Sequence, residues 1–212
     1  MRSTTSAPRS VHRRGWICAL LAAPLALACT TASPTRPTQV ELRDEAGFRL
    51  SEEVRVSAAV RSDFDEAVRA LEAQRYEHGI ALLEEVTEAA PQLTTAHIDL
   101  GIAYQRVDDL ASAEKSLRKA LELSPRHPVA HNELGIVYRR TGRFAEARAS
   151  YERALELYPD FHFARRNLAV LCDMYLADAD CALEHYELYT QVVPDDPEVA
   201  IWIADLRNRA GR

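Results

Sequence analysis

Two histidines have the spacing of metal ligands on a helix. His127 and His131 are four residues apart, so both side chains would lie on one helical face if a helix ran through them. Pro128 follows His127 directly, and a proline at this place is typical of a helix start. We therefore interpret both histidines as ordinary helix residues and expect no metal site and no cofactor.

Motifs of known catalytic sites are missing from the sequence. It contains no Gly-x-Ser-x-Gly, no Walker loop and no His-Glu-x-x-His, the patterns of serine hydrolases, nucleotide-binding proteins and zinc peptidases. Asp178 and Asp180 lack the glycine and the distal glutamate of a calcium-binding EF-hand loop. The sequence predicts a protein that is not an enzyme, has no catalytic residues and takes no small-molecule substrate.

Composition and charge indicate a helical, acidic protein. The 212 residues include 26 Lys and Arg, 32 Asp and Glu, and only seven glycines. The formal net charge of −6 argues against a nucleic-acid-binding protein. Four scattered cysteines are too few for a fold built on disulfides. These numbers favour an ordinary globular chain of one domain, or two at most.

The first 28 residues have the pattern of an export signal. Four arginines and no acidic residue precede an apolar run from Trp16 to Ala28. This run suits the core of a signal peptide and is too short to span a bilayer. The small residues before Cys29 resemble a bacterial lipobox, which implies cleavage there and lipidation of Cys29. The alternative is a plain secretory signal with a chance cysteine, and the sequence does not decide between general and twin-arginine export.

Lipidation would anchor the chain to a membrane. Thr30, and not Asp, follows Cys29, and in Gram-negative lipoproteins this implies an outer-membrane address, facing the periplasm. Residues 30–39 are rich in Thr, Ser and Pro and predict a tether. Val54 and Val56 alternate with polar residues, which predicts an extended segment that lies on the first repeat or fills its groove.

The rest of the chain is a repeat. Four prolines recur at steps of 34, 34 and 35 residues: Pro91, Pro125, Pro159 and Pro194. Gly101 and Tyr104 recur in step as Gly135 and Tyr138. Apolar residues recur with the 3.6-residue period of amphipathic helices. This pattern resembles the tetratricopeptide repeat (TPR), a helix–turn–helix of 34 residues.

The TPR resemblance implies an all-α solenoid of about four repeats with a C-terminal capping helix. We expect Trp202 to be a packed residue of that cap. The predicted organisation is a signal peptide (1–28), a lipid-anchored tether and extension (29–59), a solenoid (60–196, in units of about 60–93, 94–127, 128–161 and 162–196), and the cap with its tail (197–212).

Two cysteines flank an extra residue in the fourth unit. Cys172 lies late in the first helix of that hairpin and Cys181 early in the second. Antiparallel helices can bring such positions together, and a disulfide persists outside the cytoplasm. A disulfide between them and two buried free thiols both remain open at this point.

In TPR proteins the first helix of each hairpin lines the concave face, so the resemblance implies a groove for a protein or peptide. The expected groove residues are Ile98, Ile102, Gln105, Arg106, Asn132, Ile136, Arg139, Arg140, Arg166 and Val170, with Asp173 at the same face. Arginine forks suit carboxylates and extended acidic peptides. Alternatively, the arginines are solvated or paired with local acids. The lysines and asparagines of chaperone-binding carboxylate clamps are missing.

These features together predict an exported TPR scaffold that supports the assembly of a cell-envelope complex, such as a pilus, secretion or motility machine. In this it resembles the TPR pilotins of pilus secretins. The alternative is a non-catalytic accessory or regulator of a cell-wall or energy-transducing envelope complex. A weak enzyme, a hypothesis of another class, is disfavoured by the missing catalytic motifs.

Overall fold

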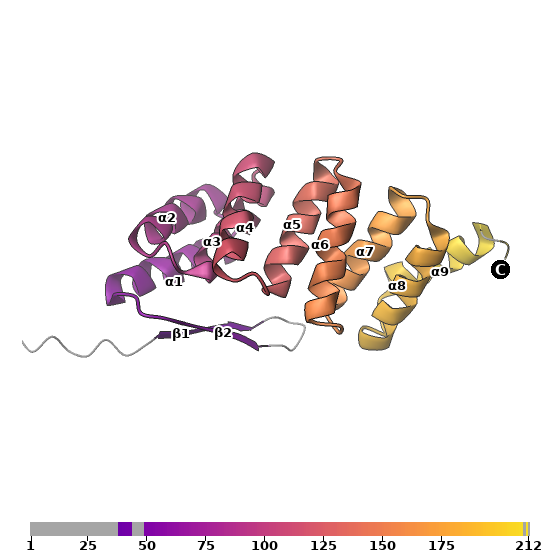
Figure 1. Ribbon diagram of the computed structural model, residues 1–212, viewed down its shortest axis with the longest axis horizontal. Coiled ribbons are helices and arrows are strands. Elements are labelled where there is room, and N and C mark those ends of the chain that lie inside the picture. The colour runs from indigo at the N-terminus through magenta and orange to yellow at the C-terminus, as the bar shows by residue number, and fades with distance from the viewer. Residues whose placement is uncertain (1–37, 44–48, 210, 212) are drawn as a thin grey trace, which may run out of the picture. The chain divides into compact units, whose positions relative to one another are not determined.

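The computed structural model describes residues 38–43, 49–209 and 211, and it builds the repeat region from helices in chain order (Figure 1). They form four antiparallel hairpins followed by a single helix. Their bounds are α1 Ala58–Glu72, α2 Tyr76–Ala89, α3 Thr94–Arg106, α4 Leu110–Leu123, α5 Pro128–Arg140, α6 Phe144–Leu157, α7 His162–Met174, α8 Ala179–Val192 and α9 Pro197–Arg209. The predicted all-α solenoid is confirmed.

A short β-hairpin precedes the helices. Strand β1 (Thr38–Arg43) pairs with β2 (Arg49–Val54) in antiparallel register. After β2, Val54 and Val56 pack against the core of the first two helical hairpins. The expected extended segment is therefore real, and it pairs with an upstream strand that the sequence analysis did not foresee.

The helices begin where the sequence supplies a cap. The side chains of Ser57, Asp109 and Asp178 accept hydrogen bonds from backbone N–H groups three residues ahead, at 3.0 to 3.2 Å. Asp196 does the same for α9, because its Oδ1 accepts from the Val199 N–H at 3.2 Å. Such caps satisfy amide groups that the first helical turn leaves without partners.

Each hairpin turns at a residue with a left-handed backbone. These residues have φ between +52° and +77°: Gln74, Asp108, Gly142 and Ala177. Glycine adopts this conformation at no steric cost, whereas other residues adopt it only with some strain. Only the third hairpin uses glycine at this place, so the other three turns carry some backbone strain.

Glycines let the helices of one hairpin approach closely. A Cβ atom added to Gly101 would lie 2.6 Å from Leu117 Cγ, and one added to Gly135 would lie 2.5 Å from Tyr151 Cε1. The ring of Tyr151 therefore occupies the space that a larger residue at 135 would need. This explains physically why Gly recurs at one repeat position and a bulky residue recurs opposite it.

The core runs through the hairpins as two clusters of buried residues. The first lies mainly in α1 to α3, and the second continues from α3 to α9. Trp202 of α9 is half-buried, and its ring centroid lies 5.5 Å from that of Tyr186, as expected of a packed cap residue.

The predictions for the signal peptide, for Cys29 and for most of the tether concern residues 1–37, which lie outside the described part of the chain. Within the described residues, no helix is both long enough and apolar enough to cross a membrane.

Candidate functional site

The predicted binding residues lie on the first helices of successive hairpins, and we call this surface of α3, α5, α7 and α9 the odd-helix face. Its residues differ in accessibility. Ile98, Gln105 and Asn132 are buried. Ile102, Ile136, Arg139, Arg166 and Val170 are half-buried, and Arg106 and Arg140 are exposed.

Hydrogen-bonded polar side chains connect α3, α5 and α7, which are the first helices of their hairpins, across this face. Gln105 Nε2 donates to Glu133 Oε2 at 3.0 Å, and Asn132 Nδ2 donates to Glu133 Oε1 at 2.9 Å. Asn167 Nδ2 then donates to Asn132 Oδ1 at 2.9 Å. Gln105 and Asn132 were expected to contact a ligand, and here they instead hold α3, α5 and α7 together. Burial of amides requires such partners.

Two of the four predicted arginines have acidic partners within the chain. Arg140 Nη2 lies 2.7 Å from Asp108 Oδ1, and its Nη1 donates to the Gln105 carbonyl at 2.7 Å. Arg166 Nη2 lies 3.0 Å from Glu198 Oε2. For these arginines, pairing with local acids is the arrangement in the structure. Arg106 is exposed and forms no ion pair with the described residues.

Arg139 has a different environment, which is made of aromatic side chains. Its Nη1 donates to the Tyr175 hydroxyl at 3.4 Å, and its guanidinium carbon lies 5.7 Å from the centre of that ring. The buried Tyr151 hydroxyl interacts with the same guanidinium but lacks hydrogen-bond geometry. Burial raises the pKa of Tyr151 to about 12. This phenol is therefore neutral at physiological pH.

Exposed apolar side chains lie on the same helices, and the sequence analysis missed them. Met174 is 70% exposed, Ile201 is 68% exposed, and Phe163 and Tyr175 are also exposed. The repeat period could have found two of them, because Phe163 stands 34 residues after Val129 and Ile201 stands 35 residues after Arg166. Several exposed apolar residues on these helices favour an interaction surface here.

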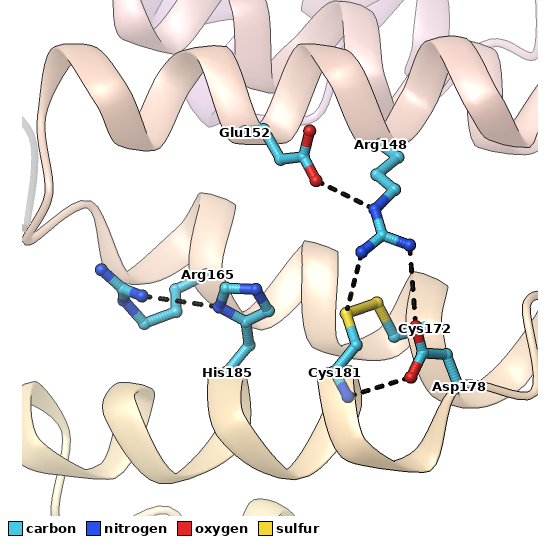
Figure 2. Close-up of a disulfide and its surroundings, with 7 residues drawn as sticks. All are labelled: Arg148, Glu152, Arg165, Cys172, Asp178, Cys181 and His185. Atoms are coloured by element: carbon cyan, nitrogen blue, oxygen red, sulfur yellow. Dashed lines mark hydrogen bonds and ion pairs between the residues drawn. A yellow bond between two sulfur atoms is a disulfide. The ribbon is translucent and has the colours of Figure 1, made fainter.

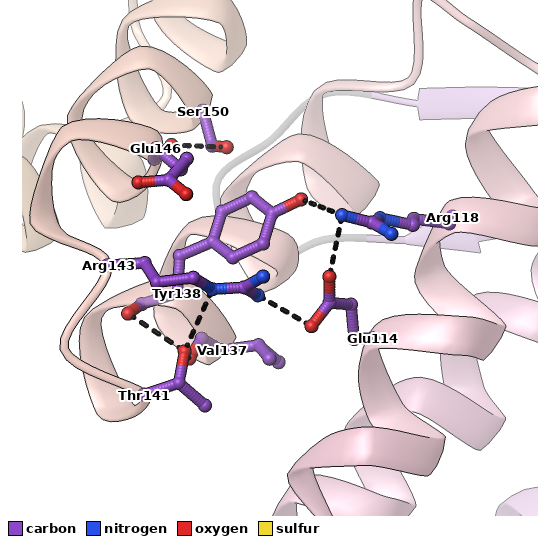
Figure 3. Close-up of polar contacts among 8 residues, drawn as sticks. All are labelled: Glu114, Arg118, Val137, Tyr138, Thr141, Arg143, Glu146 and Ser150. Atoms are coloured by element: carbon purple, nitrogen blue, oxygen red, sulfur yellow. Dashed lines mark hydrogen bonds and ion pairs between the residues drawn. The ribbon is translucent and has the colours of Figure 1, made fainter.

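The second helices of the hairpins are joined by charged contacts. Figure 3 shows Glu114 between two arginines, with Arg118 at 2.7 Å and Arg143 at 2.5 Å. Arg118 Nη2 also donates to the Tyr138 hydroxyl at 3.2 Å, and the Arg143 guanidinium carbon lies 4.1 Å from the centre of the Tyr138 ring. This cluster connects α4 to α5 and α6 and therefore acts as a structural joint between repeats.

A disulfide joins Cys172 to Cys181, with an S–S distance of 2.01 Å and a Cα–Cα distance of 5.9 Å. Figure 2 shows it beside Arg148, whose Nη1 lies 3.7 Å from Asp178 Oδ2. Both cysteines and Asp178 come close enough to share a metal ion. With the two sulfurs bonded to each other, neither thiolate is available as a ligand.

The two predicted helix histidines make local contacts. His127 Nδ1 accepts from the Ala130 N–H at 3.3 Å, so His127 caps α5. His131 Nε2 lies 3.0 Å from the Pro125 carbonyl oxygen. The His127 ring therefore caps the start of α5, and the His131 ring contacts the turn before it.

Two pockets lie away from the predicted groove residues. One of about 560 Å³ is formed by α2, α3 and α4, with Glu84 and Glu88 on one wall and Lys115 and Lys119 on the other. A second of about 500 Å³, lined by residues such as Leu183 and Arg207, lies at α8 and α9.

Residues 92–160 match the family described as Tetratricopeptide repeat. A comparison with curated protein sequences found no match. Among solved structures, the chain is similar to one described as "Functional Characterization of Pseudomonas Aeruginosa pilF", with a TM-score of 0.66, 23% identity, and coverage of 72% of this chain and 69% of that one.

Two other structures extend the likeness. "MamA 41-end from Desulfovibrio magneticus RS-1" has a TM-score of 0.65 and 17% identity over 73% of this chain and 87% of that one. "First TPR of Spaghetti (RPAP3) bound to HSP90 peptide SRMEEVD" has a TM-score of 0.54 and 22% identity over 58% and 98%. At these identities the likeness shows the TPR fold.

Proposed function

We propose that this tetratricopeptide repeat protein is an exported, lipid-anchored scaffold that binds a protein or peptide on its odd-helix face and supports assembly of a cell-envelope complex. One observation carries the binding proposal: the exposed side chains of Phe163, Met174 and Ile201 lie on α7 and α9, and exposed Tyr175, which follows α7, contacts Arg139. A similar repeat domain, that of RPAP3, holds a peptide of HSP90, which supports the same use of the fold here.

Export and anchoring rest on the sequence before residue 30. The arginines, the apolar run and Cys29 have the order of a lipoprotein signal. Acyl chains would supply the attachment, because an acidic chain has little electrostatic attraction to anionic lipid.

A photo-crosslinking amino acid at Met174 tests the binding face in the native cell. Met174 is 70% exposed on α7, and Val192, on the second helix of the same hairpin, is a matched apolar control at 44% exposure. We expect one envelope protein to be captured from position 174 and not from 192. Equal capture from both positions would contradict the assignment of the face.

The anchor is tested separately by Cys29→Ser. This variant should leave the membrane fraction and appear in the soluble fraction while keeping its circular dichroism spectrum. Continued retention in the membrane would refute lipidation at Cys29.

A further inference from the structure

Arg139 is a half-buried cation without a counter-ion in the described part of the chain. Three other arginines on or beside the odd-helix face are paired: Arg140 with Asp108, Arg166 with Glu198, and Arg209 with Asp173 at 2.8 Å. No described carboxylate lies within 4.0 Å of Arg139. Exposed Arg106 also lacks an acid, but water can solvate it.

Burial lowers the pKa of Arg139, but its contacts with Tyr151 and Tyr175 raise that pKa overall, so the two phenols stabilise the cation without bringing a negative charge. Tyr175 offers a hydroxyl at 3.4 Å, a long hydrogen bond. Tyr151 stays a neutral phenol because burial raises its pKa to about 12. Arg139 Nε and the Tyr151 hydroxyl are buried, and neither has a hydrogen-bond partner among the described residues. The cation is thus left without an opposite charge nearby, which a ligand anion would supply.

We propose that Arg139 is the receptor for a carboxylate of the protein partner, held between the Arg139 guanidinium and the Tyr175 hydroxyl. This inference rests on the proposed function and narrows it to one charged contact. The planar guanidinium presents paired N–H groups that fit a carboxylate. The exposed Met174 and Tyr175 offer apolar contact to the neighbouring part of the ligand.

The sequence alone favoured four arginines for this role, and the structure selects one. In Arg140 and Arg166, a ligand carboxylate would have to displace an acid that is already present. At Arg139 it would instead supply the missing charge. A ligand carboxylate can therefore bind at Arg139 without breaking an existing ion pair.

The test follows the Nε–Hε NMR signal of Arg139 in the full chain, assigned by its loss in Arg139→Lys. The probes are N-acetyl-leucine, which carries a terminal carboxylate, and N-acetyl-glutamic acid α-amide, which carries a side-chain carboxylate. N-acetyl-leucinamide and N-acetyl-glutamine amide are their neutral matches. We expect a saturable shift with one or both acids and at least tenfold weaker binding of the amides.

Variants separate binding from a structural role. Arg106→Lys should leave the titration unchanged, and Tyr175→Phe should weaken the acid severalfold while keeping the fold. Equal shifts with acids and amides, or none with any probe, would overturn the carboxylate site. If crosslinking from Met174 still captures its partner in that case, the proposed function stands and only this inference fails. If capture fails as well, both fail.

Discussion

Reduction of the Cys172–Cys181 disulfide should destabilise the last hairpin. The two cysteines are nine residues apart, and closing a loop of this length in the unfolded chain is worth about 2.5 kcal/mol in the chain-entropy model. For a chain of this size, about 1 kcal/mol shifts Tm by about 2–4 °C. Reduction should therefore lower Tm by about 5–10 °C.

The assay is thermal unfolding followed by circular dichroism at 222 nm, with and without a phosphine reductant. The variant Cys172→Ala/Cys181→Ala is the control, because it keeps the other cysteines and should not respond to reductant. Wild type in reductant should melt close to this variant.

Hydrogen exchange can show where the stability is lost. Helices of a solenoid contact mainly their neighbours, so a perturbation stays local. Protection should fall in α7 and α8 and remain in α1 and α2. The reasoning is refuted if both thiols react with an alkylating agent before reduction, or if reduction leaves Tm unchanged.

Three further substitutions test the packing, the turns and a half-buried acid. Gly135→Ala should lower the free energy of unfolding in urea by about 1–3 kcal/mol, because the new Cβ meets the Tyr151 ring; a loss below about 0.5 kcal/mol would contradict this packing. Gln74→Gly should raise it by about 1 kcal/mol, because Gln74 has φ of 58°, whereas Gln74→Ala should bring no gain. Burial raises the pKa of Asp99 from 3.8 to about 7, so the folded state holds this proton at pH values where the unfolded chain has lost it. Stability from Asp99 is then full below about pH 4 and lost as pH rises through 7, and Asp99→Asn should raise Tm at pH 8 more than at pH 4; an equal effect at both pH values would argue against a raised pKa of Asp99.

The sequence predicts the helical hairpins well because each hairpin depends on residue types that recur at a fixed spacing along the chain. Pro125 and Pro159 separate repeats, and Gly101 and Gly135 mark close approach of helices, so the all-helical fold follows from residue type and spacing. The antiparallel hairpin before α1 did not follow, because a two-stranded pairing has no repeat period to reveal it.

The binding face was predicted only in outline. Residue type identifies Arg140 and Arg166 as cations, but their neutralisation depends on acids 32 residues away, in the preceding repeat for Arg140 and in the capping helix for Arg166. That distance is close to one repeat, so an aligned comparison of units could find these pairs. Arg139 instead contacts Tyr175, which lies in the turn of the fourth unit. That unit has an extra residue, so the repeat period does not predict this contact.

At one repeat position the fourth hairpin has a covalent bond within itself, where the two hairpins before it contact the preceding unit. Tyr104 binds Glu84 and Tyr138 binds Arg118 of the preceding unit, whereas Cys172, at the corresponding place, bonds to Cys181 of its own hairpin. Under the proposed function, the chain is tethered at one end and holds a partner, so it would bear a pulling force. Here the disulfide would keep α7 and α8 together when the chain is pulled.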